Sequence, residues 1–80
     1  MNVHFNTVNG QLVTWTDATI FFVEWAHGAK SSYRDIAVIR EGDLRRAVTL
    51  YNKLPAGEGR KKRLKMWNPG EKAQVLARAT

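Results

Sequence analysis

The chain has 80 residues, of which 44% are hydrophobic and 25% are charged, and its net charge is +6. This length allows one domain, residues 1–80, and the ordinary apolar fraction excludes wholesale disorder. The lack of cysteine excludes disulfides and thiolate metal sites. No apolar run reaches the roughly 20 residues that span a bilayer, and the first residues lack the features of a signal peptide. We therefore expect a cytoplasmic protein without a membrane partner.

The charge is distributed unevenly along the chain. Residues 1–43 carry three bases and five acids, a net charge of −2, whereas residues 44–80 carry ten bases and two acids, a net charge of +8. Five of these bases fall within residues 60–65. Such asymmetry is typical of proteins that bind a polyanionic or acidic partner.

The first sixteen residues predict a β-hairpin. Asn9-Gly10 suits a type I′ turn, which needs positive φ at both central residues, and alternating strands flank it. A two-residue loop places Phe5 opposite Thr14 and His4 opposite Trp15. The two faces of the hairpin then differ, because side chains alternate. One face carries Val3, Phe5, Thr7, Leu12, Thr14 and Thr16, and the other carries His4, Asn6, Val8, Val13 and Trp15.

Two further strands are expected before the middle of the chain. Residues 19–25 are β-branched and aromatic, and their four consecutive apolar residues predict a strand covered on both faces, at least in its middle. Residues 33–40 alternate and favour a fourth strand, with a short helix as the alternative.

A helix is expected after Gly42. Asp43 is a good N-cap candidate, and Pro55 and Gly57 end the helix. Its apolar stripe comprises Leu44, Ala47, Val48, Tyr51 and Leu54. Its charged side comprises Arg45, Arg46 and Lys53.

The remaining residues predict a C-terminal hairpin. Residues 61–67 alternate, and Asn68-Pro69-Gly70 supplies a turn. Residues 72–79 then form a strand or a short helix, with the strand favoured by the preceding turn. The predicted fold is α+β, with a small, twisted, mainly antiparallel sheet of five to six strands and one helix packed on one face.

Catalysis has little support in the sequence. No nucleophile motif or phosphate-binding glycine loop is visible, and the two histidines, His4 and His27, lie far apart. Glu24, His27 and Asp35 are a conceivable acid–base set, but an acid ending a strand beside a loop histidine is the simpler interpretation. We therefore expect no enzyme activity, no cofactor and no metal.

The basic segment is the main candidate for function. If residues 61–67 form a strand, Arg63, Lys65 and Trp67 point the same way, and such a row can neutralise phosphates and stack on a base. The alternative is a solvated edge strand whose charges prevent edge-to-edge pairing. The candidate partner-binding or nucleic-acid-binding residues are Arg45, Arg46, Lys53, Arg60, Lys61, Lys62, Arg63, Lys65 and Trp67.

The aromatic residues suggest a core and a possible second surface. Burial preferences place five of them in the core: Phe5, Phe21, Phe22, Trp25 and Tyr51. His4, Val13 and Trp15 lie on the other hairpin face. They form either a second interface or a face that residues 26–42 cover.

In overall size, and in the element order from residues 3–15 through 44–54 to 61–79, the chain resembles the small phage-encoded inhibitors called anti-CRISPR proteins. We expect a non-enzymatic monomer or homodimer, and the resemblance implies that the protein docks on a host nucleic-acid-handling complex and blocks its nucleic-acid binding. It would act in the host cell cytoplasm. The basic charge suits an acidic protein surface or bound RNA within that complex. The alternative is direct binding of DNA or RNA by the C-terminal basic hairpin and the helix.

Overall fold

The computed structural model describes residues 2–80, which form six strands and one helix. The elements are β1 (Val3–Val8), β2 (Gln11–Thr16), β3 (Ile20–Ala26), β4 (Arg34–Ile39), α1 (Leu44–Lys53), β5 (Lys61–Trp67) and β6 (Gln74–Ala79). This confirms the α+β class and the strand interpretation of residues 33–40 and 72–79. The strands divide into a two-stranded antiparallel sheet, β1-β2, and a four-stranded antiparallel sheet in the order β4-β3-β5-β6.

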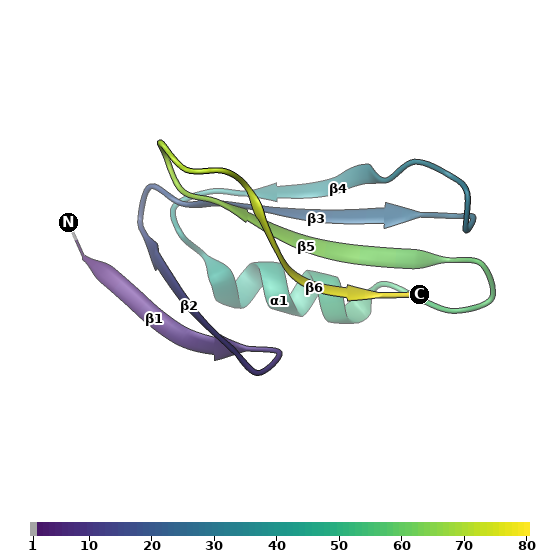
Figure 1. The fold of residues 1–80 in the computed structure, drawn as a ribbon, viewed down its shortest axis with the longest axis horizontal. Coiled ribbons are helices and arrows are strands. Elements are labelled where there is room, and N and C mark those ends of the chain that lie inside the picture. Colours follow the sequence, from purple (N-terminus) through teal and green to yellow (C-terminus); the bar gives the residue numbers. More distant parts are fainter. Residues whose placement is uncertain (1) are drawn as a thin grey trace.

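The predicted arrangement of all strands in one sheet is therefore wrong. The chain reverses between β2 and β3, where the Thr19 amide donates to the Thr16 carbonyl oxygen at 3.1 Å and the Thr16 amide donates to the Thr19 hydroxyl at 2.9 Å. This turn sends β3 into a pairing with β4 and β5 instead of with β2. The hairpin is left as a separate layer beside α1 (Figure 1).

The N-terminal hairpin has the predicted register. Asn9 and Gly10 both have positive φ, and Phe5 pairs with Thr14 while His4 pairs with Trp15. Val13 is 1% exposed within the main core, and Val8 and Trp15 pack against that core. The indole Nε1 of Trp15 also donates to the Gly42 carbonyl oxygen at 2.9 Å, which joins the hairpin to the start of α1.

The helix covers one face of the four-stranded sheet (Figure 1). Asp43 is the N-cap, and its Oδ1 accepts from the Arg46 amide at 3.1 Å. The apolar stripe buries Leu44, Ala47 and Tyr51 in the core. The sheet contributes the rest of this core through side chains that include Phe21, Val23, Leu64, Met66 and Leu76. Because side chains alternate along a strand, the intervening residues of β3 and β5 point away from α1.

The expectation for the aromatic residues is partly wrong. Phe21 and Tyr51 are buried, and Trp25 is half-buried. Phe22 is half-buried on the sheet face away from α1. Phe5 is 72% exposed, because the hairpin turns its other face inward. Both hairpin faces carry apolar residues, so alternation alone does not select the inner one.

Candidate functional site

The structure divides the predicted basic residues between the two sides of the four-stranded sheet. Leu64 and Met66 of β5 are buried beneath α1, so Arg63, Lys65 and Trp67 lie on the opposite face. The helix bases lie on the exposed side of α1 and do not join that row: Arg45, Arg46 and Lys53. The helix bases and the β5 row therefore do not form one continuous surface.

A buried carboxylate organises the middle of the β5 row. Glu24 of β3 pairs in register with Arg63, and the Arg63 Nε lies 2.6 Å from Glu24 Oε1. The Lys65 ammonium is 3.9 Å from Glu24 Oε2. Glu24 is only 8% exposed, so these two cations compensate a charge that is largely removed from water. The hydrogen bond to Glu24 orients the Arg63 side chain on the sheet, and Lys65 lies close enough for charge attraction only.

Tyr33 stacks with the basic side chains at the start of β5. The Arg63 guanidinium carbon lies 3.9 Å from the centre of the Tyr33 ring, and the Lys61 ammonium lies 4.8 Å from it. Lys61 also donates to the Ala29 carbonyl oxygen at 3.1 Å. Arg78 of β6 pairs opposite Arg63 and lines a hollow together with Tyr33 and Lys61. Positive charge and an aromatic ring are thus concentrated at this end of the sheet.

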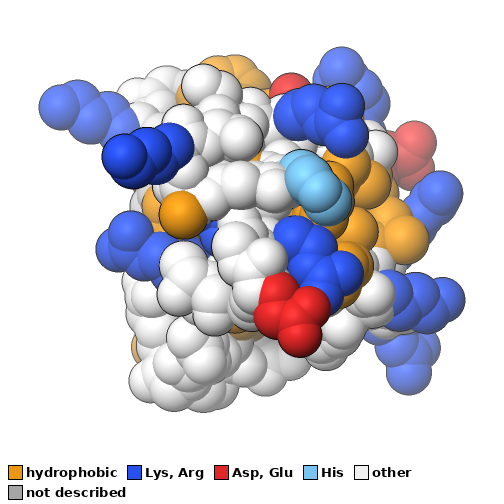
Figure 2. Space-filling view, turned by 90° about the vertical axis from the view of Figure 1, so that its right-hand side faces the viewer, with side chains coloured by type: hydrophobic (Ala, Val, Ile, Leu, Met, Phe, Trp, Pro, Cys, Tyr) orange, Lys and Arg blue, Asp and Glu red, His pale blue; other side chains and the backbone are white. Residues whose placement is uncertain are grey.

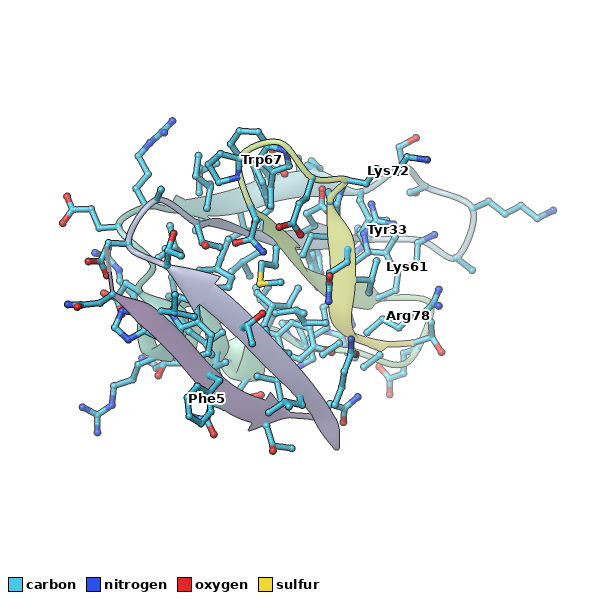
Figure 3. All side chains as sticks on the ribbon, turned by 60° about the vertical axis from the view of Figure 1, so that its left-hand side comes forward. Phe5, Tyr33, Lys61, Trp67, Lys72 and Arg78 are labelled. Carbon is cyan, nitrogen blue, oxygen red and sulfur yellow. The ribbon has the colours of Figure 1, made fainter. Side chains whose placement is uncertain are left out.

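We call this surface the outer sheet face; its members are Tyr33, Lys61, Arg63, Lys65, Trp67 and Arg78. In Figure 3, Tyr33, Lys61 and Arg78 lie together beside β6, Trp67 lies toward the other end of β5, and Phe5 lies apart on the hairpin. Figure 2 shows Lys and Arg side chains projecting on several sides of the end where β5 begins. Sequence reasoning missed Tyr33 and Arg78. Tyr33 lies just before β4, which is separated from β5 by β3, and Arg78 lies on β6 next to β5, so only the tertiary structure brings them together.

Two other predicted residues have local structural partners. The Lys62 ammonium donates to the Tyr51 carbonyl oxygen at 2.9 Å and lies 4.4 Å from the centre of the Tyr51 ring, so it satisfies the C-terminal end of α1. Arg60 lies before β5, where its guanidinium is 3.3 Å from the Glu58 carboxylate. Lys62 therefore faces the helix layer, away from the outer sheet face.

Burial raises the pKa of the Tyr51 hydroxyl above its ordinary value of 10.0, and the charge of Tyr33 adds to the effect. The folded state holds this proton more tightly than the unfolded chain, so the associated stability is complete below about pH 10 and is lost as the pH rises further. We expect wild type to lose more unfolding free energy than Tyr51→Phe between about pH 9 and about pH 11, measured by urea unfolding. Equal losses of unfolding free energy in wild type and Tyr51→Phe would contradict a raised pKa of the Tyr51 hydroxyl.

The possible second interface at His4, Val13 and Trp15 lies mostly against the rest of the chain. Val13 is in the core, and the Trp15 ring stacks on His4 and meets Phe21 edge to face, with centroids 5.5 and 6.4 Å apart. The His4 Nε2 keeps an exposed contact with Asp17 at 2.9 Å. Val13 and Trp15 therefore pack the hairpin against the core, His4 lies at the edge of this contact, and Gly42 covers part of the face.

The fold brings two members of the conceivable acid–base set together, because Glu24 pairs in register with Asp35 and both line one shallow hollow, and it gives His27 a different partner. Glu24 binds Arg63 and Lys65, whereas the His27 ring packs against Trp25 with centroids 5.5 Å apart. Within residues 2–80, no group of three or more His, Asp or Glu side chains is placed to hold a metal ion. No catalytic role for these residues follows from their positions.

Comparison with known proteins finds no relative of this chain. No protein-family model matches the chain, and no curated protein or solved structure is similar enough to match it. In the part of the chain that the structure describes, the helix is too short to cross a bilayer. Any functional conclusion must therefore come from the surfaces themselves.

Proposed function

We propose that the protein is non-catalytic and binds single-stranded nucleic acid on the outer sheet face. The observation that carries this proposal is the row of Lys61, Arg63 and Lys65, flanked by Tyr33 at one end and Trp67 at the other, on a sheet face that α1 leaves open. The row extends about 20 Å at ~3.3 Å per residue, enough for several unstacked nucleotides.

The chemistry suits a single strand. The ammonium and guanidinium groups attract phosphates, while Trp67 offers a ring face on which a base stacks and Tyr33 supports the cations beside it. Arg63 is held by Glu24 and by the Tyr33 ring, so little rotamer entropy is lost when it meets a ligand. The outer sheet face carries no helix that would enter the major groove of a duplex, so affinity for duplexes should be lower.

A titration of a labelled oligonucleotide of about 12 nucleotides, followed by fluorescence anisotropy at several salt concentrations, tests the proposal. Lys61→Gln/Lys65→Gln removes two positive charges from the outer sheet face. Because each phosphate contact contributes about −0.7 to the slope of log K against log salt for single strands, we expect the slope to become about 1.4 less steep. Trp67→Ala should instead weaken binding about 5- to 100-fold with the slope unchanged, because stacking is lost.

Arg46→Gln/Lys53→Gln is the matched comparison. It removes the same formal charge from α1, on the other side of the sheet. If this variant lost as much affinity as Lys61→Gln/Lys65→Gln, binding would depend on net charge alone and the outer sheet face would not be the site. Circular dichroism of all variants checks that they remain folded.

A second proposal is the inhibitor of anti-CRISPR type that docks on a host nucleic-acid-handling complex. It is favoured by the outer face of the hairpin, where Val3, Phe5 and Leu12 are 64%, 72% and 69% exposed. Apolar side chains exposed together commonly mark a protein interface. The same titration separates the two functions, because an inhibitor that contacts only protein has no measurable affinity for free oligonucleotides even at low salt.

A further inference from the structure

A groove of about 860 Å³ lies between the tip of the N-terminal hairpin, α1 and β6. Its floor is apolar and includes Val8, Trp15, Val48 and Leu64. This size is within the range of natural binding pockets. The groove is on the helix side of the sheet, so it is separate from the row formed by Lys61, Arg63 and Lys65.

One wall of the groove is the free edge of β6. Ala77, Arg78 and Ala79 all line it, although successive side chains of a strand point to opposite faces. The groove must therefore run along the backbone itself. β6 is the last strand in the order β4-β3-β5-β6, so its outer side presents peptide N–H and C=O groups without a neighbouring strand in residues 2–80.

The charge of the groove has one sign. Arg45, Lys62 and Arg78 line it, and no Asp or Glu of the described residues does. Asn6, Asn9 and Asn52 add amide groups near these cations. A ligand that fits this groove should combine apolar side chains for the floor with negative charge for the rim.

We propose that the groove binds an extended acidic and apolar segment of a partner protein, which adds to the edge of β6 as a fifth strand. Strand addition supplies main-chain hydrogen bonds, and the alternation of side chains sends every second residue to the floor. Acidic residues in between point away from the floor and lie beside Arg78, while Arg45 of α1 attracts them from across the groove. This site needs no nucleic acid, and it shares only Arg78 with the outer sheet face.

The test uses the full chain, labelled with ¹⁵N, and a synthetic peptide of about eight alternating Val and Glu residues. We expect amide shifts concentrated at Val8, Val48 and residues 77–79. A peptide of the same sequence with N-methylated alternate peptide bonds should lose binding, because it cannot donate to β6. Replacing Glu by Lys in the peptide should also abolish binding.

Arg45→Gln should weaken peptide binding about fivefold, as expected for one partly exposed charge pair. The matched control is Arg40→Gln, an exposed arginine outside the groove that should bind the peptide like wild type. Absence of binding, equal binding of the N-methylated peptide, or shifts confined to Lys61–Trp67 would each overturn the proposal. If Arg45→Gln weakened oligonucleotide binding and left peptide binding unchanged, the groove would belong to the nucleic-acid surface, and this proposal would also fail.

Discussion

Phe21→Ala is expected to destabilise the protein by about 3–5 kcal/mol, the usual cost of removing a buried phenylalanine. Phe21 is 0% exposed, contributes to the core beneath α1, and meets the edge of Trp15 from the hairpin. It therefore touches all three layers of the fold. Small domains have little stability to lose, so this variant should be largely unfolded at room temperature. Urea unfolding followed by circular dichroism measures the change.

Phe22→Ala is the matched control, because it removes the same side chain from the next position of β3. Phe22 is half-buried on the outer sheet face, where no helix covers it. Its loss should cost only about 1–2 kcal/mol, since less apolar area is withdrawn from water. Similar losses for the two variants would mean that α1 does not cover the Phe21 side of the sheet as described.

Gly42→Ala is expected to cost about 2–4 kcal/mol, because the change combines backbone strain with a clash. Gly42 has φ of +66°, and a Cβ atom there would press against the Thr16 carbonyl oxygen of the backbone. The residue also donates its amide to the Thr19 carbonyl oxygen at 3.1 Å and accepts from the Trp15 indole. A shift of the backbone to relieve the clash would disturb both bonds and loosen the hairpin.

Gly57→Ala separates the backbone strain of a positive φ from the clash of the added Cβ atom. Gly57 also has positive φ, at +85°, but a Cβ atom there meets nothing within 4 Å. Only the conformational cost of about 1 kcal/mol should remain. The difference in unfolding midpoint between the two variants then measures the close approach of Gly42 to Thr16. If Gly57→Ala destabilised the protein as much as Gly42→Ala, the close approach of Gly42 to Thr16 would contribute nothing to the loss of stability.

Local patterns in the chain predicted most elements correctly. Asn9-Gly10 specifies the hairpin register through its need for positive φ, and Asp43 marks the start of α1 through its side-chain acceptor. The alternation of residues 61–67 likewise predicted that Arg63, Lys65 and Trp67 share a face. These features depend on neighbours a few residues apart, so the sequence contains the information directly.

The binding surface was predicted less completely. The basic segment was found from its charge, but Arg45, Arg46 and Lys53 were joined to it although the helix covers the other side of the sheet. Tyr33 was missed, because its contact with Arg63 depends on two strands that each pair with β3. Contacts of this kind join residues about 30 positions apart and leave no periodic signal.

The excess of positive charge in residues 44–80 is therefore divided mainly between two surfaces, the outer sheet face and the exposed side of α1. By itself the sequence determined the strands, the helix, the hairpin register and the excess of bases in residues 44–80, because local propensity and alternation specify them. Only the tertiary structure decided that Phe5 is exposed while Val13 is buried, and that Lys62 faces the helix while Lys61 and Arg63 surround Tyr33. The physical reason is that both faces of these strands carry residues able to pack, and the layer that docks on each face selects which side is buried.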